Sequence, residues 1–123
     1  MYRFEKILVP LDGSEFAEMA LEPAVSIAQA MDSELVLFRV AQPIPRTRAL
    51  AEMPDVYNDV VAATGREAEN YLQDIRGRFP EENIVVEYRP GEQGVARQIL
   101  DYALNSGVDL IVMSSHGYTG VKR

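Results

Sequence analysis

The chain has 123 residues and a formal net charge of −7, from 12 Lys and Arg side chains against 19 Asp and Glu. This acidic balance argues against nucleic acid as a partner, because polyanions are bound by basic surfaces. The absence of Cys excludes disulfides and Cys-ligated metals. Its apolar runs are too short to span a bilayer and no signal-peptide core opens the chain, so we expect a cytoplasmic protein without a membrane partner.

Four short apolar runs alternate with three longer segments of helical periodicity. The runs rich in Val, Ile and Leu are Lys6–Leu11, Glu34–Val40, Asn83–Arg89 and Val108–Met113. Within 17–31, 56–79 and 96–104, apolar residues recur at the three-and-four spacing of one helix face. The order β-α-β-α-β-α-β predicts an α/β fold with an open parallel sheet and helices on both of its faces.

The composition of each segment indicates its place in this sheet. The first and fourth runs are apolar at nearly every position, which is typical of central strands buried on both faces. The third begins to alternate, as an edge strand does. Pro23 lies inside the first helical pattern and should kink or split that helix near Leu21–Glu22. The stretch Ala41–Pro54 contains three prolines and predicts a long surface loop.

Two loops at the expected carboxyl edge of the sheet carry residues suited to ligand binding, because ligands of open parallel sheets bind there, where the strand order reverses. The first loop, Pro10–Glu15, contains Asp12, which can accept hydrogen bonds from a ribose or a base. It also contains Ser14, which can cap the following helix. Capping alone accounts for both residues equally well, so the sequence leaves the two interpretations open.

The second loop is Ser114–Gly120, after the fourth run. Its glycines Gly117 and Gly120 expose backbone N–H groups that can form a nest for phosphate, although an ordinary turn has the same composition. Positive charge follows at Lys122 and Arg123. No acidic residue lies in this stretch, so it is the part of an acidic chain best suited to an anion.

Catalytic motifs are missing from both loops. His116 is the only histidine and has no Asp or Glu near it in sequence, which argues against a metal site. A triad of Ser14, His116 and Asp12 would lack a nucleophile elbow. Neither a Walker loop nor Gly-x-Gly-x-x-Gly follows the first run, and a phospho-receiver would need further acidic residues after the first and third runs. We therefore expect a protein that is not an enzyme.

The chain resembles the universal stress protein family. The resemblance rests on Ile7–Ser14, on the run Glu34–Val40 and on Val112–Gly117, and it extends from Phe4 to Arg123. It implies a three-layer α/β sandwich of the adenine-nucleotide alpha-hydrolase-like type, with an open parallel sheet ordered 3-2-1-4-5. The fifth strand of that order is absent from this chain. We therefore expect one domain over residues 1–123 that lacks the C-terminal strand and the end of the phosphate loop.

The resemblance also implies a nucleotide site built from both loops. In nucleotide-binding members the residue matching Asp12 contacts the nucleoside, the backbone matching Val40 holds adenine, and the residue matching Met113 borders the ribose. The phosphates lie on a Gly-x-x-Gly loop, whose first glycine is Ser114 here and whose second is Gly117. The full predicted set of binding residues is Pro10, Leu11, Asp12, Ser14, Val40, Met113, Ser114, Ser115, His116, Gly117 and Gly120.

The resulting hypothesis is a cytoplasmic stress-response protein that binds ATP or AMP and is regulatory rather than catalytic. Mg²⁺ would accompany the phosphates of ATP only. The resemblance also implies a homodimer, commonly formed through the fifth strand. The alternative is a nucleotide-free member that acts as a dimerisation or interaction module. Ser114 favours this alternative, because its Cβ limits how closely the backbone can approach a phosphate.

Overall fold

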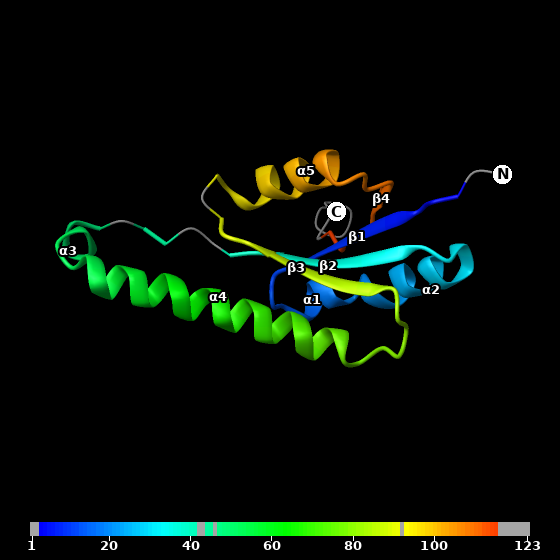
Figure 1. Ribbon diagram of the computed structural model, residues 1–123, viewed down its shortest axis with the longest axis horizontal. Coiled ribbons are helices and arrows are strands. Elements are labelled where there is room, and N and C mark those ends of the chain that lie inside the picture. Colours follow the sequence, from blue (N-terminus) through cyan, green and yellow to red (C-terminus); the bar gives the residue numbers. More distant parts are fainter. Residues whose placement is uncertain (1–2, 42–43, 46, 92, 116–123) are drawn as a thin grey trace, which may run out of the picture.

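The computed structural model describes residues 3–41, 44–45, 47–91 and 93–115. Its strands are β1 (Lys6–Leu11), β2 (Glu34–Val40), β3 (Ile84–Arg89) and β4 (Leu110–Ile111). They form one parallel sheet in the order β3-β2-β1-β4, with helices on both faces (Figure 1). This arrangement confirms the predicted α/β fold and the predicted order of the first four strands.

The interior of the sheet is made by β1 and β2. They pair along their whole length, from Lys6 opposite Glu34 to Leu11 opposite Arg39. Most of their side chains are buried, because both strands have a neighbour on each side and helices above and below. The third strand lies at an edge, as its alternating pattern predicted.

The fourth strand differs from its prediction in length and burial. A strand over Val108–Met113, central and buried on both faces, was expected, but β4 covers two half-buried residues. In the described part of the chain it pairs with β1 alone, through Leu110 opposite Ile7 and Ile111 opposite Leu8. With a neighbour on one side only, its apolar side chains are less covered than those of a central strand.

The first helical segment is split in two. Helix α1 (Glu15–Glu18) ends before Met19, and α2 (Leu21–Met31) begins after Ala20. A split was predicted near Leu21–Glu22, and it occurs two residues earlier. Pro23 therefore lies in the first turn of α2, where its missing N–H costs no helical hydrogen bond.

The second segment forms α4 (Pro54–Arg76), preceded by a short helix α3 (Arg48–Ala51). Helix α3 was not predicted, and it corrects the expectation of an uninterrupted loop over Ala41–Pro54. Thr47 caps it, with Leu50 N donating to Thr47 Oγ1 at 3.1 Å. The C-terminal half of α4 packs on the sheet, whereas its N-terminal half and α3 extend beyond the sheet (Figure 1).

Two apolar layers cover the sheet. On one face, side chains of α2 and α4 pack on β1 and β2 around Leu37 and Leu72. On the other face α5 (Val95–Asn105) packs on Phe38 and Val40 through side chains including Ile99. None of the helices in the described ranges is long and apolar enough to cross a membrane.

Candidate functional site

A pocket lies at the carboxyl ends of β1 and β2, next to the chain that follows β4. It has a volume of about 210 Å³. Its walls are Pro10, Leu11, Asp12, Phe16, Ala17, Phe38, Val40, Val95, Ile99, Met113 and Ser114. The strand order reverses at β1, which has β2 on one side and β4 on the other. The pocket is therefore at the position where open parallel sheets bind their ligands.

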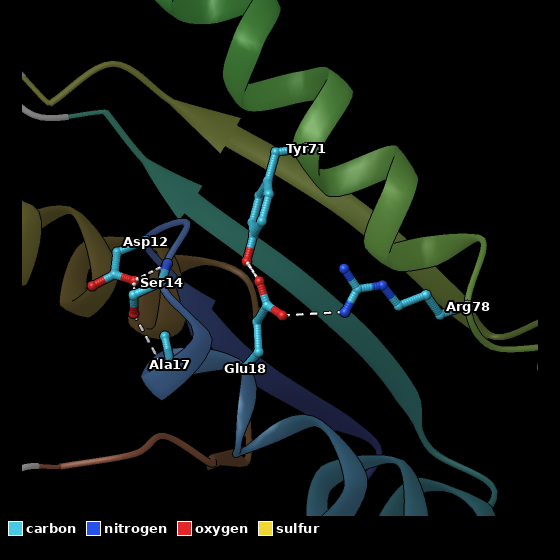
Figure 2. A network of polar contacts seen from close by, with 6 residues as sticks. All are labelled: Asp12, Ser14, Ala17, Glu18, Tyr71 and Arg78. Carbon is cyan, nitrogen blue, oxygen red and sulfur yellow. Dashed lines mark hydrogen bonds and ion pairs between the residues drawn. The ribbon is translucent and has the colours of Figure 1, made fainter.

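The loop between β1 and α1 is folded by hydrogen bonds of its own residues (Figure 2). Asp12 Oδ1 accepts from Ser14 N at 2.9 Å and from Ser14 Oγ at 2.6 Å. Ser14 Oγ in turn accepts from Ala17 N at 3.1 Å, so the capping interpretation of Ser14 is confirmed. Between them Gly13 has a φ of +91°, a conformation that favours glycine.

Asp12 stabilises this turn through its hydrogen bonds with Ser14, and it also lines the pocket. The hydrogen bond from the Ser14 hydroxyl, together with that from Ser14 N–H, holds the pKa of the Asp12 carboxyl below its ordinary value of 3.8. The Arg39 guanidinium acts in the same direction, while partial burial opposes both. The pocket thus has an ionised carboxylate in its wall at neutral pH, which is an acceptor for hydroxyl or amino groups of a ligand.

The opposite wall is apolar and comes from β2 and α5. Phe38 and Val40 are two positions apart on β2 and therefore point to the same face of the sheet. Val95 and Ile99 of α5 pack against them there. Gly91 allows the connection between β3 and α5 to cross the end of β2 at this point. A Cβ on Gly91 would lie 1.8 Å from the carbonyl oxygen of Ala41, the residue after Val40.

Six residues of the predicted set line this pocket together: Pro10, Leu11, Asp12, Val40, Met113 and Ser114. Ser14 is not in the wall and acts on it through Asp12. Ser115 is exposed and is not in the wall either. His116, Gly117 and Gly120 lie outside the described residues. In the ranges that are described, no group of three or more His, Cys, Asp and Glu side chains could hold a metal ion.

The sequence prediction missed five wall residues: Phe16, Ala17, Phe38, Val95 and Ile99. Phe38 had a usable signal, because it stands two residues before Val40 and so shares its face of the strand. Val95 and Ile99 share one face of α5 by their spacing, but only the packing of that helix on β2 brings this face to the pocket.

The fold and the pocket define a class of protein, the open parallel α/β domain with a pocket where the strand order reverses. Comparison with protein families then identifies the chain further. The model of the universal stress protein family matches residues 3–123. The chain belongs to this family.

Known relatives agree with that assignment. Universal stress protein YxiE of Bacillus subtilis is 30% identical over 126 residues, which span 97% of this chain and 84% of that protein. The structure of MJ0577 of Methanocaldococcus jannaschii superposes with a TM-score of 0.73 at 27% identity, covering 98% of this chain and 81% of the other. A universal stress protein solved in complex with cAMP gives 0.57 at 20% identity, covering 99% and 78%, and supports the fold alone.

Proposed function

We propose that this chain binds an adenine nucleotide, ATP or AMP, in the pocket at the ends of β1 and β2, and that it is a regulatory stress-response protein rather than an enzyme. One observation carries the proposal. Asp12, Val40 and Met113, which match the nucleoside-binding positions of nucleotide-binding family members, line a single pocket. A family member of known structure holds cAMP, which is itself an adenine nucleotide.

The chemistry of the walls supports a base and a ribose at this end of the ligand. Phe38, Val40, Val95 and Ile99 offer an apolar surface for a planar base. The Asp12 carboxylate is an acceptor for ribose hydroxyls but repels phosphate. The phosphates would therefore lie away from Asp12, toward Ser114 and the residues that follow it.

A regulatory role is favoured over catalysis by the character of the wall. Among the described wall residues Asp12 is the one with an acidic or basic side chain, and its lowered pKa makes it a weak proton acceptor. Binding would act by stabilising the state of the protein that holds the nucleotide better. With ATP, Mg²⁺ would be carried by the phosphates. A homodimer in the cytoplasm belongs to the same proposal and rests on the family resemblance.

Calorimetric titration of the full chain with AMP, ATP and cAMP tests the proposal, with GMP as the control for the base. We expect the adenine nucleotides to bind and to stabilise the fold, by about 2.7 kcal/mol at a concentration one hundred times the dissociation constant. The proposal is rejected if AMP, ATP and cAMP, each at millimolar concentration, give no heat of binding and do not change the melting temperature. That result would favour the nucleotide-free interaction module, for which Ser114 in the wall is the supporting residue.

A further inference from the structure

Helix α1 forms one wall of the pocket although it has little support of its own. It consists of four residues, none of which is buried, and it contributes Phe16 and Ala17 to the wall. A helix of one turn is not stable in isolation, because nucleation costs more than one turn returns. The Ser14 cap stabilises its N-terminal end. Contacts from elsewhere in the fold are needed to hold the other end in place.

Glu18, the last residue of α1, makes those contacts with α4 and with the turn that follows it (Figure 2). Its Oε2 accepts a hydrogen bond from the Tyr71 hydroxyl at 2.6 Å, and its Oε1 pairs with Arg78 Nη1 at 3.1 Å. Only 17% of the Glu18 side chain is exposed. Tyr71 lies on the part of α4 that packs on the sheet, and Arg78 follows the end of that helix. Both carboxylate oxygens are therefore tied to residues more than fifty positions away.

A second contact ties α4 to the turn at the start of the same loop. The guanidinium of Arg39, on β2, lies close to Gly13, since a Cβ added at Gly13 would be 3.4 Å from Arg39 Nη2, and its charge acts on the Asp12 carboxylate of the same turn. The same guanidinium lies 4.9 Å from the centre of the Tyr71 ring and 3.2 Å from Glu67 Oε2, both on α4. The Arg39 side chain is 16% exposed, so its contact with the Tyr71 ring is only weakly screened by water, whereas Glu67 is 63% exposed and its ion pair with Arg39 is more strongly screened.

We propose that Glu18, Tyr71 and Arg39 are positioning residues for the pocket, which lock the loop from Asp12 to Glu18 onto α4. Tyr71 takes part in both contacts, since its hydroxyl donates a hydrogen bond to Glu18 and its ring makes a cation–π contact with Arg39. Helix α4 thereby sets where Phe16, Ala17 and Asp12 stand in the wall. By linkage, a ligand that needs this wall in place stabilises α4, and a change in α4 alters affinity in the pocket.

The locking of the loop to α4 is a property of the ligand-free chain, whereas its effect on affinity rests on the proposed function. The variant Tyr71→Phe removes the hydroxyl and keeps the ring beside Arg39. Tyr88→Phe is the matched control, because Tyr88 also packs on α4, at Gly65, and its hydroxyl does not bind Glu18. Both variants lose one hydroxyl beside the same helix.

Hydrogen exchange of the ligand-free full chain tests the locking by itself. In Tyr71→Phe we expect the amides of Ala17 to Ala20 to exchange about three to ten times faster than in the wild type, the range for losing one typical hydrogen bond. In Tyr88→Phe the same amides should keep the wild-type rate. Equal rates for these amides in both variants would overturn the proposal.

Titration with AMP tests the effect on the pocket. Tyr71→Phe should weaken AMP binding about three- to tenfold, and Tyr88→Phe should leave it unchanged. Glu18→Ala should weaken it at least as much, because it removes the contacts with Tyr71 and Arg78 together, and adding Tyr71→Phe to Glu18→Ala should change the affinity little further, since the contact with Tyr71 is already lost. Unchanged affinity in Tyr71→Phe, or fully additive effects, would overturn the linkage. If the wild type binds no nucleotide, the proposed function fails, and the exchange rates still decide whether α4 locks the loop.

Discussion

Replacing Gly91 with Ala should destabilise the protein and deform the pocket, although it adds a single methyl group. Gly91 is buried where the connection after β3 crosses the end of β2. The added Cβ would stand 1.8 Å from the carbonyl oxygen of Ala41 and 3.3 Å from Val40 Cγ1. Cβ atoms in folded proteins essentially never come within 3.0 Å of such an atom, so the two backbone segments have to move apart by about 1.2 Å.

The magnitude follows from the contacts that this movement disturbs. Overpacking of a close-packed site costs about 1–3 kcal/mol. The hydrogen bond from Ala41 N to the Arg89 carbonyl oxygen, 3.0 Å long, joins the same two segments, and its loss costs about 1 kcal/mol. Replacing Gly with Ala also lowers the conformational entropy of the unfolded chain, which offsets about 0.4–1 kcal/mol of this loss. We expect a net loss of about 2 kcal/mol in the free energy of unfolding.

Urea denaturation measures this loss against a matched variant, Gly77→Ala. Gly77 caps α4 with a φ of −68°, and a Cβ there would stand 3.5 Å from its nearest neighbour, an ordinary contact. Gly77→Ala should therefore be neutral or stabilising by up to about 1 kcal/mol. The urea midpoint of Gly91→Ala should fall about 1 M below the wild type. Equal midpoints for the two variants would refute the close approach at Ala41.

Three further predictions concern the loop before α1. Asp12→Ala should weaken nucleotide binding by about 1–3 kcal/mol, measured by calorimetry beside melting of the same variant, and lower stability with unchanged affinity would limit Asp12 to the turn. Ser14→Ala should lower the free energy of unfolding by about 1 kcal/mol, because Ala17 N loses its capping acceptor, and a midpoint equal to the wild type would contradict this. The pKa of Asp12 is lower in the folded chain than its ordinary 3.8. The ionised carboxylate therefore stabilises the fold above about pH 4. This stabilisation is lost as the pH falls through the pKa of Asp12 in the folded chain. Denaturation of Asp12→Asn should thus show a stability deficit at pH 6 that shrinks toward pH 2, and a constant deficit would count against the shift.

The predictable part of this fold is the part that local pattern controls. The bounds of β1 and β2 agree with the expected Lys6–Leu11 and Glu34–Val40, because strands covered on both faces need unbroken apolar runs. The four-residue helix α3 was missed, since one turn is too short to show a helical period. The fourth strand looked central by composition, yet its burial depends on neighbours that composition does not reveal.

The same division holds for the candidate site. Asp12 and Ser14 were identified by their place after a strand and by a family motif, and Ser14 does cap α1. The wall residues Val95 and Ile99 became part of the pocket only when α5 packed across β2. The contact of Glu18 with Tyr71 joins residues separated by 53 positions, and no local pattern encodes it. The sequence by itself determined which loop lines the pocket, because strand ends are local features. Tertiary packing alone decided what holds that loop, because the hydroxyl of Tyr71 reaches Glu18 only after α4 has docked on the sheet.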